Sequence, residues 1–132
     1  MSSRGTFAKY GYPTNKEYKT IKVTNSGAKI LIGIDKNHSM PELSHSPNAV
    51  YVKLKKDNKT LHEIKIFNEF NYPVIEIGFH PEAKLNNGDR MTNILHYHTF
   101  NGIDRSNAYY MNDIIKEKYK IYLKEFGLYD KC

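Results

Sequence analysis

Three short strand-like segments lie between residues 50 and 80, two of them with alternating side chains, and this pattern constrains the fold more than any other. The segments are 50–54, 61–67 and 74–80. Residues 57–58 (Asp-Asn) and 68–72 have turn-forming compositions, so the connections between the segments are short. Strands joined by tight turns pair with their neighbours. The sequence therefore predicts an antiparallel meander at the centre of the chain.

Further strand-like segments flank the meander. Residues 18–24 and 29–35 surround Asn25-Ser26-Gly27, a turn sequence, and predict a hairpin. Residues 93–100 predict one more strand after a polar loop. Residues 36–49 contain two prolines and predict an irregular connection. Residues 1–17 show no sustained periodicity, and we expect a loosely packed N-terminal arm there.

The C-terminal region predicts one amphipathic helix over residues 107–126, capped by Ser106 or Asp104 and ended by Gly127. Its apolar stripe comprises Met111, Ile114, Ile115, Ile121 and Tyr122, and its basic face comprises Lys116, Lys120 and Lys124. The predicted architecture is α+β: a single domain over residues 1–132, with a mostly antiparallel five- to six-stranded sheet and the C-terminal helix packed on it.

Composition limits the cellular location of the protein and the kinds of partner that it can bind. The 132 residues include one cysteine, Cys132, so no disulfide can form within one chain. No apolar stretch approaches the roughly 20 residues of a membrane span, and the N-terminus lacks a secretory signal. We therefore expect a cytoplasmic protein. A formal net charge of +6 favours acidic partners such as nucleic acid, or else reflects only a lysine-rich surface.

Histidines gather in the strand segments 74–80 and 93–100. Side chains alternate along a strand, so Glu76 and His80 share one face of the first, and His96 and His98 share one face of the second. If the two strands are neighbours, these side chains converge on one exposed face of the sheet. Arg90 and Arg105 flank the second strand.

Three interpretations of this cluster remain open. His96 and His98 could act as acid and base in RNA cleavage, with Arg90 or Arg105 stabilising charge on the phosphate. The same histidines could bind a divalent metal ion, with Glu76 or His80 completing the shell. Finally, they could be ordinary polar residues without chemistry. We expect no metal cofactor, because no fourth ligand has convincing spacing and no cysteine is available.

Several short motifs have the order of a known group. Residues 40–51 read Met-Pro-Glu-Leu-Ser-His-Ser-Pro-Asn-Ala-Val-Tyr, and they are followed by the 61–67 segment, His80 and His96-x-His98. Over about residues 20–100 this order resembles small phage- and prophage-associated domains that occur alone or at the ends of minor head and toxin-like proteins. Leu95 stands where that group usually has proline, and Phe79 stands where an acidic residue is common.

The resemblance implies two functions. Some domains of that kind are likened to the metal-independent ribonucleases that include barnase, which assigns catalysis to His80, His96 and His98 with Arg90. The alternative is a phage-encoded inhibitor, similar to anti-CRISPR proteins, that binds an RNA-guided or nucleotide-dependent defence protein in the host bacterial cell without catalysis. In that case Arg105, Lys116, Lys120 and Lys124 would carry the binding.

Overall fold

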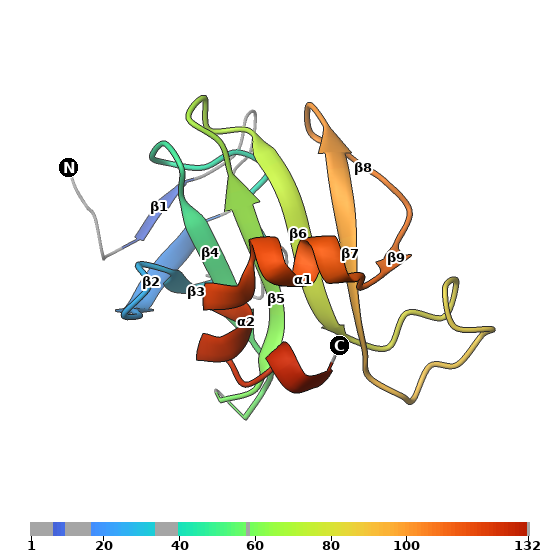
Figure 1. Ribbon diagram of the computed structural model, residues 1–132. Coiled ribbons are helices and arrows are strands. Elements are labelled where there is room, and N and C mark those ends of the chain that lie inside the picture. Colours follow the sequence, from blue (N-terminus) through green and yellow to red (C-terminus); the bar gives the residue numbers. More distant parts are fainter. Residues whose placement is uncertain (1–6, 10–16, 34–39, 58, 132) are drawn as a thin grey trace.

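The computed structural model describes residues 7–9, 17–33, 40–57 and 59–131. In this part of the chain one nine-stranded sheet carries most of the regular structure (Figure 1). Its strands are β1 Phe7–Lys9, β2 Glu17–Val23, β3 Lys29–Gly33, β4 Val50–Leu54, β5 Leu61–Phe67, β6 Pro73–His80, β7 Ile94–Asn101, β8 Asp104–Arg105 and β9 Tyr109–Tyr110.

The strands follow sequence order from β1 to β8, and β9 pairs with β7. Every pair is antiparallel except β3 with β4, which pair in parallel. The predicted hairpin, the central meander and the mostly antiparallel sheet are therefore confirmed. The predicted strand number of five or six is too low, because β1, β8 and β9 have only two or three residues and show no periodicity.

The N-terminal arm was predicted over residues 1–17, and most of it lies outside the described residues. Within it, Phe7–Lys9 forms strand β1 and pairs with β2. The described part of the chain contains no helix that is long and apolar enough to cross a membrane.

The C-terminal region differs from the single helix predicted over residues 107–126. It forms two short helices, α1 Asp113–Lys118 and α2 Lys120–Glu125, and a final turn, η1 Tyr129–Lys131. Asn112 caps α1 by accepting a hydrogen bond from the backbone N–H of Ile115, so the prediction of a cap at Ser106 or Asp104 is wrong. Residues 107–112 are instead occupied by β9 and its flanks, whereas Gly127 has the predicted left-handed conformation.

The helices lie across one face of strands β4 to β7 (Figure 1). Tyr119, Leu123 and Leu128 are buried there against strand residues such as Ile64 and Ile77. Met111, Ile115 and Tyr122 of the predicted stripe also pack against this core, so the stripe is confirmed in part. Ile114 and Ile121, which were predicted to pack, are 79% and 61% exposed.

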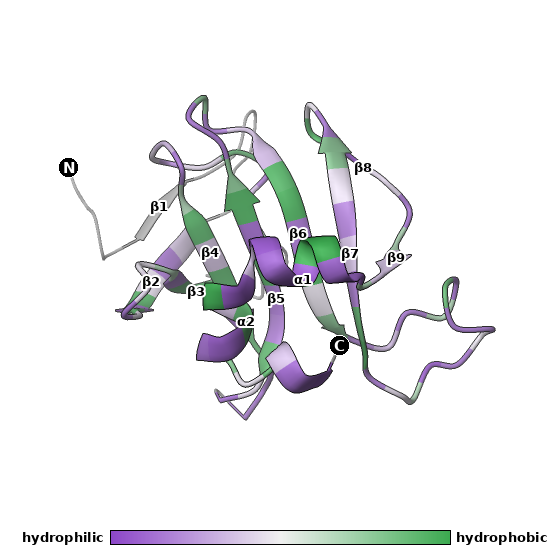
Figure 2. Cartoon of the chain, in the orientation of Figure 1, coloured by the Kyte–Doolittle hydropathy of each residue, from purple (hydrophilic) through white to green (hydrophobic). Residues whose placement is uncertain are grey.

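The opposite face of the sheet has two parts. Next to β2 to β5 it is apolar, with a second buried cluster of Tyr18, Leu31, Met40, Ala49, Tyr51 and Phe67. Across β5, β6 and β7 this face is polar. Hydrophobic and hydrophilic segments alternate along these central strands, as Figure 2 shows. The polar part carries the histidines.

Candidate metal centre

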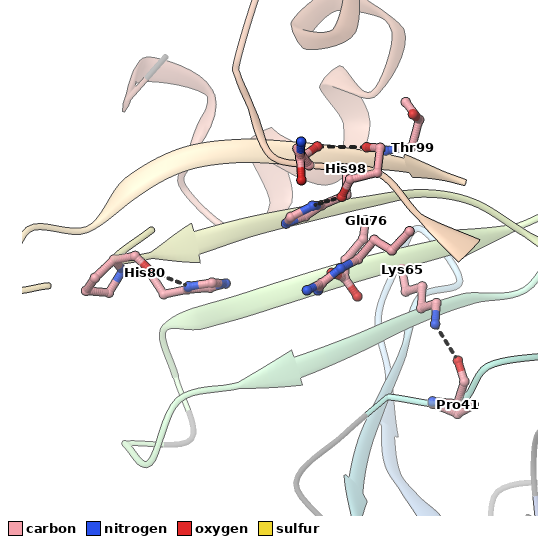
Figure 3. A network of polar contacts seen from close by, with 10 residues as sticks. Pro41, Lys65, Glu76, His80, His98 and Thr99 are labelled. Atoms are coloured by element: carbon pink, nitrogen blue, oxygen red, sulfur yellow. Dashed lines mark hydrogen bonds and ion pairs between the residues drawn. The ribbon is translucent and has the colours of Figure 1, made fainter. Parts of the chain in front are cut away.

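Strand register brings the polar side chains of β6 and β7 together. Glu76 pairs with His98, and Gly78 pairs with His96, across the two antiparallel strands. On the other side of β6, Lys65 of β5 pairs with Glu76. Figure 3 shows Glu76, His80, His98 and Lys65 on this one face. The structure thus brings together the histidines that the alternation of side chains placed on one face.

Four histidine rings form a continuous row on this face. The ring of His62 stacks on that of His80 at 4.4 Å between centroids, and His80 meets His96 edge-on at 4.7 Å. His96 in turn meets His98 edge-on at 5.6 Å. Gly78 makes room for the row, since a Cβ there would lie 2.8 Å from Nε2 of His80 and 3.0 Å from Nε2 of His96.

The expectation that the cluster lies on an exposed face is wrong. His96 is completely buried, and His98 is 5% exposed. The loop after β6 and the chain from β8 to β9 cover them: Tyr110 of β9 pairs with His96, and its hydroxyl donates to the backbone oxygen of Leu85. The strand pattern could not show this cover, because it comes from short irregular segments.

Backbone carbonyls fix the orientation of three of the rings. Nδ1 of His80, His96 and His98 lies 2.9 Å from the backbone oxygens of Pro81, Ile94 and Ser106, respectively. A carbonyl oxygen can only accept, so each Nδ1 carries the proton and donates it. In the neutral form of each ring, Nε2 is therefore unprotonated and has a free lone pair.

The Nε2 atom of His96 is the exceptional polar atom of this face. It is buried and has no hydrogen-bond partner among the described residues. Buried polar atoms are otherwise nearly always paired, because leaving one unpaired costs about 1–3 kcal/mol. Burial also lowers the pKa of His96 below its usual value, so the ring is neutral at pH 7. A neutral, fully buried imidazole cannot donate a proton to a substrate, but it is well suited to bind a metal ion.

Glu82 completes a possible ligand set with two of these histidines. One ring nitrogen of His96, one of His98 and a carboxylate oxygen of Glu82 all lie within 4.8 Å of one another. Glu82 belongs to the loop directly after β6, so it approaches the histidines from the side rather than from the sheet. Two histidines and one carboxylate are a common ligand set of catalytic zinc, which leaves one coordination position open.

A pocket of about 430 Å³ opens next to this set. Glu82 and His98 form part of its wall, and Lys84 and Arg105 add two positive charges. Arg105 also donates a 2.8 Å hydrogen bond to the buried carboxylate of Glu76, which fixes it beside the pocket. The remaining lining residues are Leu85, Ser106, Asn107 and Ala108. Its two positive charges suit the pocket to a small anionic group.

Other residues predicted for the site lie elsewhere. Arg90 is exposed in the β6–β7 loop, and no hydrogen bond or ion pair joins it to the histidines in the described structure. Among the basic residues of the helices, Lys120 lies 3.6 Å from Glu117, and Lys116 and Lys124 lie over the ring of Tyr129. They are far along the chain from the cluster and belong to the face that the helices cover.

Sequence reasoning missed His62 as a site residue. Strict alternation along β5 places it with Ile64, away from Glu63 and Lys65. The strand is irregular at its start, where the register shifts between Lys53 and Leu54, and both Leu61 and Ile64 pack into the same core. His62 is consequently free to stack on His80.

Three ionisable side chains in or next to the row of histidines have pKa values shifted by burial. Burial and the nearby carboxylate of Glu76 raise the pKa of Glu63 to about 7. Burial lowers the pKa of Lys65, whose Nζ donates to the backbone oxygen of Pro41 at 2.7 Å (Figure 3). Burial, and next the neighbouring His80, lower the pKa of His62 to about 4.

We expect Glu63→Gln to stabilise the metal-free protein at alkaline pH. Between pH 4.5 and about 7 the folded chain holds a proton on Glu63 that the unfolded chain releases, so the free energy of unfolding falls as the pH rises through this window. Removing the carboxyl removes that fall. The free energy of unfolding of Glu63→Gln should therefore exceed that of the unchanged protein by roughly 2 kcal/mol at pH 8 and by little at pH 4. Urea unfolding in EDTA at both pH values measures the difference.

The matched control is Glu69→Gln, which makes the same change at an exposed position. His62 contributes with the opposite sign, because its lowered pKa makes stability rise between pH 4 and 6.5, but this contribution is common to all three proteins and cancels. Equal stability differences at pH 4 and pH 8 for Glu63→Gln would contradict the raised pKa.

Comparisons with family models, with curated proteins and with solved structures gave no match to this chain.

Proposed function

We propose that this protein is a metal-dependent hydrolase of phosphodiesters, in which Glu82, His96 and His98 bind a divalent transition-metal ion such as zinc. The observation that carries the proposal is the unpaired, buried Nε2 of His96, held toward a carboxylate and a second free imidazole. Nδ1 of each ring donates a hydrogen bond to a backbone oxygen, which fixes the orientation of both rings as in established histidine metal sites.

The chemistry follows from the open coordination position. A metal ion held by Glu82, His96 and His98 would lower the pKa of a bound water and polarise a phosphoryl oxygen. Hydrolysis at this site would place the oxygen of water on phosphorus, break the bond to the leaving oxygen, and give a phosphomonoester and an alcohol. Lys84 and Arg105 stabilise the negative charge that develops on the phosphoryl oxygens. The net charge of +6 attracts a polyanionic substrate.

RNA is the proposed substrate, as the resemblance of residues 20–100 to phage-associated domains implies, and the host cytoplasm is the proposed location. The proposal keeps the site of the acid–base interpretation but changes the role of its histidines. A completely buried His96 does not reach an RNA backbone, whereas it reaches an ion held between itself, His98 and Glu82.

The test is RNA cleavage by protein that has been stripped of metal. We expect no cleavage in EDTA, recovery of cleavage when zinc or manganese is added, and loss of that recovery in Arg105→Ala. Cleavage that continues in EDTA would replace the metal mechanism by acid–base catalysis. Absence of cleavage with every divalent metal would refute the hydrolase.

Gly78→Ala should weaken zinc binding about tenfold or more. Its Cβ would lie 3.0 Å from Nε2 of His96, closer than real Cβ atoms normally approach, so this completely buried ring must shift. Calorimetric titration of zinc measures the change. Val74→Ala, an exposed position on the same strand, is the control. Unchanged affinity in Gly78→Ala would place the ion away from this ring.

A second candidate function, inhibition of a host defence protein, is supported by the exposed surface of the helices. Ile114 and Ile121 are more than half exposed there, beside the exposed Lys120 and Lys124. An apolar surface with positive charges around it is typical of a binding site for a negatively charged partner.

Phage plating on bacteria that carry an RNA-guided defence tests this second function. Protection of the phage by this protein should disappear in Ile114→Asp and persist in His98→Asn. Protection that depends on His98, or no protection at all, would argue against it.

A further inference from the structure

The other end of the histidine row contains a second set of ligands that the proposed hydrolase does not use. His62 and Glu63 belong to β5 and His80 ends β6. One ring nitrogen of each histidine and one carboxylate oxygen of Glu63 lie within 4.8 Å of one another. We propose that a second divalent metal ion binds between His62, Glu63 and His80.

The donor atoms favour a transition metal. Two imidazoles and one carboxylate select zinc, nickel or cobalt over magnesium or calcium, which prefer oxygen ligands. The hydrogen bond from Nδ1 of His80 to the backbone oxygen of Pro81 fixes that ring and leaves its Nε2 free (Figure 3). His62 stacks on the same ring, with 14° between the ring planes, so both side chains are already held together before an ion arrives.

The two sites differ in how far solvent reaches their ligands. His62, Glu63 and His80 are all partly exposed, whereas His96 and His98 are buried. An ion at the second site therefore remains in contact with solvent and keeps water ligands. It exchanges with free metal in solution more readily than an ion held by His96 and His98.

The two sites share a wall at Gly78. Nε2 of His80 lies 2.8 Å from the position of a Cβ on Gly78 and Nε2 of His96 lies 3.0 Å from it, so these two nitrogens are within about 6 Å of each other. Two doubly charged ions bound to these neighbouring nitrogens repel each other. We expect the second ion to bind about tenfold or more weakly when the first is present.

Calorimetric titration of stripped protein with zinc tests the second site without reference to RNA cleavage. The expected result is two binding events of unequal affinity. His62→Asn should remove the weaker event and keep the tighter one. His98→Asn should remove the tighter event and strengthen the remaining one, because the repulsion is gone. His45→Asn makes the same change at an exposed histidine outside the row and should keep both.

The outcomes separate this inference from the proposed function. Two events of which one depends on His62 support the second site even if RNA is never cleaved. A single event that His62→Asn does not change overturns the second site and leaves the hydrolase standing. If His62→Asn unfolds the protein, Glu63→Gln is the second variant, and an unchanged weaker event in Glu63→Gln likewise overturns the inference.

Discussion

His98→Asn is expected to lower zinc affinity by about 100-fold or more and to end metal-dependent RNA cleavage. Asparagine is the sharpest replacement available, because its side-chain NH₂ can donate to the backbone oxygen of Ser106 as Nδ1 of His98 does at 2.9 Å. The change removes the free Nε2 and keeps the hydrogen bond that holds the segment from β8 to β9 over the site. A loss of function then reports the missing ligand rather than a missing structural contact.

His96→Asn applies the same logic to the buried ligand, whose Nδ1 donates to the backbone oxygen of Ile94. The matched control is His45→Asn, since His45 is exposed in the loop before β4. Circular dichroism and a melting curve in EDTA verify that the variants are folded. Full zinc affinity in folded His96→Asn and His98→Asn would contradict the metal centre, whatever the result with RNA.

Leu123→Ala is expected to destabilise the protein by about 3 kcal/mol, whereas Ile121→Ala, two residues away, should cost less than about 0.5 kcal/mol. Leu123 is completely buried between α2 and the sheet, and its removal leaves a cavity that the strands cannot close. Ile121 is 61% exposed and loses little by truncation. Urea unfolding of the metal-free proteins measures both values.

The comparison tests which side of the helices packs on the sheet. Leu123 is buried in the same core as Tyr119 and Leu128, whereas Ile121 lies on the exposed side. A large cost for Ile121→Ala together with a small cost for Leu123→Ala would show that the other side of the helices is packed.

The alternation of side chains was sufficient to predict the central sheet. The segments 50–54 and 61–67 have the predicted limits, and β6 and β7 differ by one residue at their ends. The same alternation placed His96 with His98 and Glu76 with His80, because it depends only on the two-residue repeat of a strand. Periodicity was reliable along β6 and β7, but it failed at the start of β5, where His62 lies beside Glu63 and His80.

Burial and ligand completion depend on contacts between distant segments, and here the sequence was insufficient. Glu82 lies after a strand and His98 lies within another, and their approach follows from the path of a 13-residue loop that has no periodicity. No pattern indicated that the chain around Ser106 and Tyr110 would cover the histidines. The expectation that no metal cofactor is bound depended on the missing fourth ligand, and the sequence did not indicate that Glu82 lies within 4.8 Å of ligand atoms of His96 and His98.

The protonation states of the histidine rings test the central claim most directly. Nitrogen-15 spectra of the imidazoles, recorded on stripped protein and during zinc addition, distinguish Nδ1 from Nε2 in each ring. The account predicts that Nδ1 of His96 and His98 is protonated throughout and that Nε2 of both rings shifts to a metal-bound value at one equivalent of zinc. Nε2 signals that stay unchanged in both rings, or a protonated Nε2 of His96 at neutral pH, would contradict a metal centre at Glu82, His96 and His98.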